Sequence, residues 1–105
     1  MSAIALTKDS FQNQVQSGVT LIDFWAPWCG PCRVQLPIVE ELANEVDGRA
    51  VIAKVNVDEE VELAGQLGIT GIPTLILFKD GHIVEKLVGL RSKQDLKTKI
   101  EQLLA

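Results

Sequence analysis

The chain has 105 residues, of which 47% are hydrophobic, with 14 acidic and 10 basic residues and a formal net charge of −4. This length and composition exclude a disordered chain and predict a single domain over 1–105 with a true hydrophobic core. No basic cluster is present, so nucleic acid and anionic membrane surfaces are not expected partners.

The first half of the chain is predicted to alternate between strands and helices. Residues 4–6 form a short edge strand, and a helix follows with Thr7 as its N-cap and Gly18 at its end. The apolar and β-branched run at 19–26 predicts a strand that is covered on both faces. Apolar residues at helical spacing then predict a long second helix, in which Pro37 should produce a kink.

The second half of the chain continues this alternation and ends with a hairpin and a helix. Residues 50–57 form another buried strand, and Asp58 is expected to cap a short helix. The Asp80-Gly81 pair supplies a two-residue turn between two strands, and Ser92 starts the last helix. The order βαβαβαββα predicts an α/β fold with a central mixed sheet between helices, parallel first and antiparallel last.

The only two cysteines, Cys29 and Cys32, lie within the stretch WCGPC. A bridge that closes about four residues contributes only ~2 kcal/mol in the chain-entropy model, against ~3 kcal/mol for a fifteen-residue loop. The pair is therefore a poor device for stability, and its chemistry is the better explanation.

The cysteine turn lies where a buried strand ends and a long helix begins. A helix N-terminus stabilises an anion, and the thiolate is the reactive form of cysteine. We therefore expect Cys29 to be the exposed nucleophile with a lowered pKa, and Cys32, one turn further in, to be the shielded resolving thiol. Gly30 allows the tight turn, and Pro31 suits an early helical position.

Two other uses of the cysteine pair were weighed. A structural disulfide is disfavoured by the short span and by the lack of a secretory signal. A zinc site needs about four ligands, and beyond the two thiols only His82 is a strong ligand type, so we expect no metal. A C-x-x-C motif after a strand in a βαβ pattern indicates redox function.

Asp23 and Lys54 each interrupt an otherwise apolar strand. If the two strands are neighbours, the side chains could face each other beneath the cysteine turn. Asp23 could then act as a proton acceptor for Cys32 through a water molecule, or the pair could be a satisfied internal ion pair. The residues alone leave both interpretations open, because structural ion pairs also shift pKa values.

Two further features of the sequence are candidates for a role at the site. The Ile72-Pro73 bond precedes an apolar strand; a cis bond there is possible but uncommon, since about 5–6% of X-Pro bonds are cis. Trp25 and Trp28 flank the cysteine turn, where they either pack in the core or, for Trp28, shield the nucleophile and contact partners.

The stretches DFWAPWCGPC, GIPTLILF, KDGH and LVG resemble the thioredoxin family in order and spacing, over essentially the whole chain. The resemblance implies the thioredoxin fold, with helices on both faces of the sheet. It also implies that Cys29 attacks and Cys32 resolves, that their disulfide is the redox-active group, and that no other cofactor is needed.

The resemblance implies roles for further residues. Asp23 would assist proton transfer beside Lys54, Pro73 would follow a cis bond, Pro37 would kink the helix, and Trp25 would be structural. The surface that grips a target chain would comprise Trp28, Gly30, Pro31, Gly71, Ile72, Pro73 and Gly89. The family's usual run after the second cysteine differs here at Gln35 and Leu36; Gln35 falls on or beside the apolar stripe and, if buried, needs hydrogen-bond partners.

These features predict a protein-disulfide reductant that works by dithiol–disulfide exchange. No histidine lies between the cysteines, which favours the reducing branch over oxidases and isomerases. No G-x-G-x-x-G motif is present, so disulfide-bearing targets and a separate NADPH- or ferredoxin-linked thioredoxin reductase are the expected partners. A binding module with incidental thiols is the other class that was considered.

The expected compartment and oligomeric state follow from what the sequence lacks. The start has no secretory pattern, and no run approaches eighteen apolar residues. We expect a monomer that acts in the cytoplasm, or in an organelle stroma or matrix if a transit segment was removed, and no membrane partner.

Overall fold

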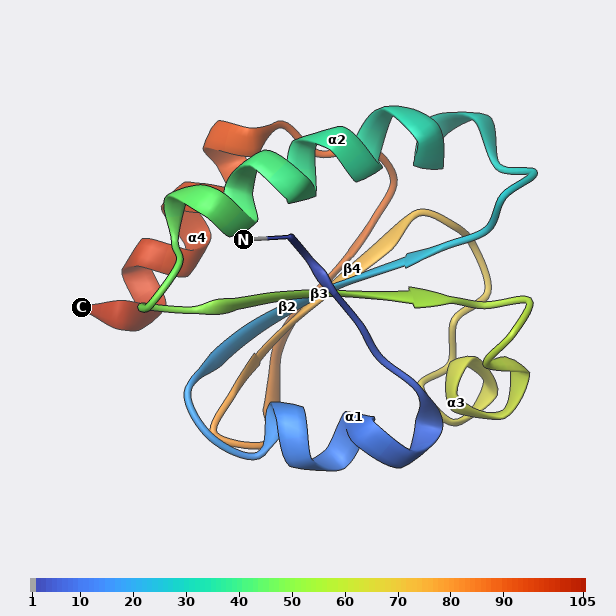
Figure 1. Ribbon diagram of the computed structural model, residues 1–105, viewed down its shortest axis with the longest axis horizontal. Helices are drawn as coiled ribbons and strands as arrows, with labels where there is room; N and C mark the ends of the chain where they lie inside the picture. Colours follow the sequence, from blue (N-terminus) through green and yellow to red (C-terminus); the bar gives the residue numbers. More distant parts are fainter. Residues whose placement is uncertain (1) are drawn as a thin grey trace.

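A five-stranded mixed sheet lies between two pairs of helices in the computed structural model, which describes residues 2–105 (Figure 1). In spatial order the strands are β1 (Ile4–Ala5), β3 (Val51–Asn56), β2 (Val19–Trp25), β4 (Thr74–Lys79) and β5 (His82–Val88). The first three strands of the chain pair in parallel, β4 runs antiparallel to β2, and β5 runs antiparallel to β4. The predicted α/β class and element order are confirmed.

Helices cover both faces of this sheet, which is why its central strands are apolar along their whole length. The helices are α1 (Lys8–Val15), α2 (Gly30–Glu45), α3 (Val61–Gln66) and α4 (Lys93–Leu104). Figure 1 shows α2 and α4 on one face and α1 and α3 on the other. Side chains of β2 alternate between the two layers: Leu21 packs with α2 and α4, whereas Ile22 and Phe24 pack with α1 and α3.

Two predicted helix starts are confirmed in atomic detail. The Thr7 side chain accepts the backbone N–H of Ser10, and the Ser10 hydroxyl accepts the backbone N–H of Thr7, which together form a capping box. The Ser92 hydroxyl accepts the backbone N–H of Asp95 at 3.1 Å. These caps satisfy amide groups that have no partner inside their helices.

The hairpin turn is also placed as predicted. Asp80 and Gly81 have φ values of 50° and 86°, the left-handed region that a two-residue turn of this kind requires. The Asp80 carboxylate accepts the backbone N–H of Gly18 at 2.8 Å. The hairpin tip is thereby joined to the turn that precedes β2.

The predicted start of α3 is wrong. Asp58 does not cap this helix; its N-cap is Glu60, two residues later. The Asn56 side chain accepts the backbone N–H of Asp58 at 2.9 Å, and the Asn56 carbonyl accepts the N–H of Glu60. The chain therefore completes a turn built on Asn56 before the helix begins, because asparagine competes for nearby backbone donors.

Helix α2 runs without a break from Gly30 to Glu45, and Pro37 lies within it at an exposed position. A proline ring has no N–H to donate to the carbonyl one turn earlier, here that of Arg33. The kink at Pro37 stays a prediction, while its place on the solvent side explains why the helix tolerates it.

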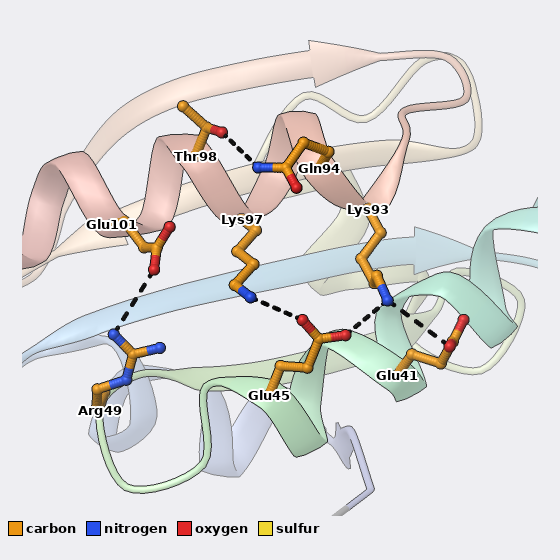
Figure 2. A network of polar contacts seen from close by, with 8 residues as sticks. All are labelled: Glu41, Glu45, Arg49, Lys93, Gln94, Lys97, Thr98 and Glu101. Atoms are coloured by element: carbon orange, nitrogen blue, oxygen red, sulfur yellow. Dashed lines mark hydrogen bonds and ion pairs between the residues drawn. The ribbon is translucent and has the colours of Figure 1, made fainter.

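A network of charged side chains joins α2 to α4 (Figure 2). Glu45 lies at its centre, with the Lys93 Nζ at 2.6 Å and the Lys97 Nζ at 2.9 Å from its carboxylate oxygens. Lys93 also approaches Glu41 at 3.7 Å. Hydrogen bonds from Lys93 and then Lys97 lower the pKa of Glu45 from 4.5 to about 2.

We predict that Glu45→Gln makes the protein slightly less stable at neutral pH. The free energy of unfolding of the variant should also decrease less than that of the wild type as the pH is lowered. A lowered folded-state pKa gives stability that is present above about pH 4.5 and is lost as the pH falls toward 2. The effect is small because Glu45 is about one-third exposed (32%). Urea unfolding from pH 7 to pH 2 measures it, with Glu59→Gln as an exposed control; equal pH profiles for wild type and Glu45→Gln would contradict the prediction.

Candidate active site at the start of α2

The two cysteines lie at the junction of β2 and α2 and are joined as a disulfide. Cys29 is the N-cap of α2, and its Sγ accepts the backbone N–H of Cys32 at 3.2 Å. Pro31 lies in the first helical turn, and the Arg33 guanidinium donates to the Pro27 carbonyl at 3.0 Å across that turn. The sulfur of Cys29 is therefore placed where unpaired helix amides favour negative charge.

The burial of the two sulfur-bearing residues differs from the expectation in one respect. Cys29 is only 5% exposed in the disulfide form, so the prediction of an exposed nucleophile is wrong for this state. It packs in one cluster with Ala26 and Cys32, against half-buried Trp25 and Ile72. Cys32 is 0% exposed, so Cys29 still has the greater access to solvent.

The loop before β4 faces the disulfide. The Ile72-Pro73 bond is cis, as the family resemblance implied, and the Ile72 carbonyl oxygen lies 3.8 Å from the Cys29 Sγ. The Pro73 carbonyl accepts the backbone N–H of Gly89 at 2.8 Å. Segments about sixty residues apart in the chain are thus brought together at one edge of the sheet, around the sulfur atoms.

A shallow hollow of ≈ 330 Å³ opens beside these segments. Its lining residues are Trp28, Val57, Ile69, Thr70, Gly71 and Ile72. Trp28 is 67% exposed, which makes it a surface residue and not a core one. Of the predicted target-binding residues, the hollow brings together Trp28, Gly71 and Ile72, and Gly30 and Pro31 are exposed nearby in the cysteine turn.

Asp58 is a site residue that the sequence did not single out. Its carboxylate accepts the indole N–H of Trp28 at 3.0 Å and so holds the exposed ring in place. The two residues are thirty positions apart. An aspartate directly after a buried strand was visible in the sequence, but it was assigned to a helix cap.

Asp23 is fully buried on the face of the sheet that α2 covers, because residues two apart in a strand, here Leu21 and Asp23, point to the same face. Among the described residues, neither oxygen of its carboxylate has a hydrogen-bond partner. Burial raises the pKa of Asp23 to about 7, and the positive charge of Lys54 limits the rise. This carboxyl can therefore hold or release a proton near neutral pH.

Lys54 is the register partner of Asp23 in the β2–β3 pair, so the two strands are neighbours as the sequence interpretation required. The Lys54 Nζ makes its ion pair with Glu40 of α2, at 3.7 Å, and within residues 2–105 no cationic group lies within 4.0 Å of the Asp23 carboxylate. The alternative of a satisfied Asp23–Lys54 ion pair is thus wrong. Glu40 also accepts the backbone N–H of Ala3, so it ties Lys54 to the N-terminal segment.

Residues 2–105 contain no group of three or more His, Cys, Asp or Glu that could hold a metal ion. His82 pairs with Lys79, which pairs with Val19, so it lies at the end of the sheet opposite the cysteine turn. None of the described helices is long and apolar enough to cross a membrane.

Comparisons with known proteins agree with this geometry. The family model described as Thioredoxin matches residues 2–102. A thioredoxin of Staphylococcus saprophyticus is 47% identical over 102 residues, covering 97% of this chain and 98% of the relative, and one of Staphylococcus haemolyticus is 48% identical over 96 residues, covering 91% and 92%. The solved structure of a mutant thioredoxin from Halobacterium salinarum superposes with a TM-score of 0.91 at 40% identity, covering 99% of this chain and 92% of that one.

We predict that Asp23→Asn raises the free energy of unfolding at pH 8 by about 2–4 kcal/mol. In the wild type the unfolded carboxyl ionises near 3.8 and the folded one near 7, so stability falls as the pH rises between these values, by about 1.4 kcal/mol per pH unit. Asparagine cannot ionise, so this decline should disappear. Urea unfolding of the oxidised protein from pH 4 to pH 8 tests it, with exposed Asp47→Asn as control; an Asp23→Asn protein that is no more stable at pH 8 would refute it.

Proposed function

This chain belongs to the thioredoxin family, and we propose that it reduces protein disulfides with Cys29 as the attacking thiol and Cys32 as the resolving thiol. The protein is a protein-disulfide oxidoreductase with a Cys29–Cys32 redox pair. The observation that carries the assignment of roles is the hydrogen bond from the Cys32 amide to the Cys29 Sγ at the first turn of α2.

The first step is the attack of the Cys29 thiolate on one sulfur of a target disulfide. The target S–S bond breaks, a mixed disulfide forms between Cys29 and the target, and the other target sulfur leaves as a thiolate that takes up a proton. The position of Cys29 at the helix N-cap supports its role, because it lowers the free energy of the thiolate relative to the thiol. Cys29 is also the more accessible of the two sulfurs.

The second step returns the active-site disulfide and requires a thiolate at buried Cys32. Cys32 gives its proton to Asp23, attacks the Cys29 Sγ, and releases the second target sulfur as a thiolate. Two electrons thereby pass from the dithiol to the target. Asp23 suits this role because its carboxyl is buried on the face covered by α2, has a pKa of about 7, and has no competing hydrogen bond among the described residues.

The target chain is proposed to lie across the exposed edge of the site. Trp28, Gly71 and Ile72 supply the walls of the hollow beside the disulfide, and the Pro73–Gly89 contact borders it. Gly30 and Pro31 add an uncharged surface next to Cys29. An exposed aromatic ring held by Asp58 and a mainly apolar wall that includes Gly71 suit an extended peptide of varied sequence.

The direction of the reaction and its supply of electrons are inferred from the dipeptide Gly30-Pro31. With no histidine between the cysteines, the Cys29 thiolate lacks the extra stabilisation of the reduced form that makes a disulfide strongly oxidising. The family implies disulfide-bearing targets and a reductase that restores the dithiol. We propose an NADPH- or ferredoxin-linked thioredoxin reductase as this partner, action as a monomer, and a reducing compartment such as the cytoplasm as its location.

We predict that Cys32→Ser accumulates covalent mixed disulfides with disulfide-bearing proteins through Cys29. The variant can carry out the first step but lacks the thiol for the second. Incubation of the reduced variant with insulin, followed by non-reducing electrophoresis and mass spectrometry, should show the adduct.

The matched control is Cys29→Ser, which retains one thiol but should give little adduct because Cys32 is buried. Equal trapping by the two variants would refute the assignment of roles. A wild-type protein that does not reduce insulin would refute the function itself.

We also predict that Asp23→Asn slows the second step by about 10- to 100-fold near pH 7, since a positioned general base typically contributes about 10²-fold or more. The rate of the first step should change much less, because in the proposed mechanism Asp23 takes its proton from Cys32 and not from Cys29. Rapid-mixing measurements of mixed-disulfide formation and decay separate the two rates. A decay rate equal to that of the wild type from pH 6 to pH 8 would show that Asp23 is not the proton acceptor.

A further inference from the structure

Gln35 is a polar residue on the buried face of α2, and its side chain is fully buried. The side-chain amide forms two hydrogen bonds, and both are with the backbone of Arg91. The Nε2 donates to the Arg91 carbonyl at 3.0 Å, and the Oε1 accepts the Arg91 N–H at 2.8 Å. The expectation that a buried Gln35 would need hydrogen-bond partners is therefore confirmed.

These two bonds connect two parts of the active site. Gln35 lies one helical turn after Cys32, on the same buried face of α2. Arg91 lies two residues after Gly89, whose N–H donates to the carbonyl of Pro73 at 2.8 Å. Residues 89–91 are thus bonded at one end to the loop that faces the disulfide, and at the other end to the helix that carries Cys32.

Residues 89–91 have few other restraints. They belong to no strand or helix, and Gly89 has a φ of +100°. The side chains of Val88 and Leu90 are 61% and 48% exposed. Without the bonds to Gln35, two hydrogen bonds would remain on this segment. They are the Gly89–Pro73 bond and a bond of 3.2 Å from the Arg91 guanidinium to the carbonyl of neighbouring Val88, and only the first reaches another part of the site.

We propose that Gln35 is a positioning residue for target binding, because it fixes residues 89–91 against α2 before a target arrives. This inference rests on the proposed function, in which Gly89 and the Pro73 loop contact the target chain. A loop that is already ordered does not lose conformational entropy on binding, so the target binds more tightly. Gln35 acts through Arg91, and within residues 2–105 no hydrogen bond joins it to either sulfur, so we expect the intrinsic reactivity of Cys29 to be unchanged.

A purely structural role would have a different signature. In that case the two hydrogen bonds would satisfy a buried amide and stabilise the fold, and their loss would lower stability without any selective change in target binding. The two roles are separated by comparing the KM for a protein disulfide with the reactivity of Cys29 toward a small reagent. A second variant of similar or greater instability provides the reference.

The test variant is Gln35→Met, which nearly conserves volume and removes both partners of the Arg91 backbone. We expect its KM for insulin to rise about three- to tenfold, the range that loss of one or two loop-ordering hydrogen bonds produces. The rate of alkylation of reduced Cys29 by iodoacetamide should stay within about twofold of wild type, whereas amide exchange of residues 89–91 should become faster.

The matched control is Val39→Ala, one turn further along the same buried face, which creates a cavity but leaves the Gln35–Arg91 bonds intact. It should lower stability and leave the KM for insulin unchanged. An equal rise in KM for Val39→Ala, or an unchanged KM for Gln35→Met, would overturn the inference. The proposed function is tested separately, by whether the wild-type protein reduces insulin. If Gln35→Met does not fold, Gln35→Asn decides, because its shorter side chain weakens both bonds to Arg91 but keeps a buried amide. A raised KM for insulin with unchanged alkylation of Cys29 supports the inference, and an unchanged KM overturns it.

Discussion

The structure depends on the arrangement by which a buried strand ends directly at the N-terminus of a long helix. Strand β2 passes through the centre of the sheet and delivers Cys29 to the N-cap of α2, where the Cys32 amide points at its sulfur. The amide groups in the first turn of a helix have no partners within it, so an anion there replaces solvent as their partner. The proposed reactivity of Cys29 is thus a consequence of where the helix starts, and the rest of the fold serves to hold that start in place.

The same layer that fixes α2 also creates the environment of Asp23, the proposed proton acceptor. Asp23 lies on β2 two residues after Leu21, so its side chain enters the interface between the sheet and α2. A carboxyl in that position cannot be solvated, and its pKa rises to about 7. The positive charge of Lys54 limits the rise, but burial has the larger effect on the pKa of Asp23. The fold accepts a less stable core in exchange for a group that titrates near neutral pH.

Much of this arrangement could be predicted from the sequence, because it follows from local patterns. Apolar runs gave the strands, Thr7 and Ser92 gave helix starts, and the spacing of Cys29 and Cys32 gave the redox motif. The details that could not be predicted depend on competition or on distant contacts. Asn56 takes the backbone donors that were assigned to a cap at Asp58, and nothing local shows that Asp58 holds Trp28. The exposure of Cys29 was overestimated because the covering residue, Ile72, is 43 positions away.

Gln35 shows how a departure from a local pattern can carry long-range information. An apolar residue at this position would pack on the stripe of α2 and make no specific contact with the chain 56 residues away. A buried glutamine instead has to find partners for both a donor and an acceptor, and an N–H and C=O of one backbone residue supply both at once. Because an unpaired buried amide is costly, these bonds favour one position of residues 89–91 over its alternatives. A polar residue in an apolar stripe therefore specifies how two parts of the site are placed relative to each other, which packing alone specifies less strictly.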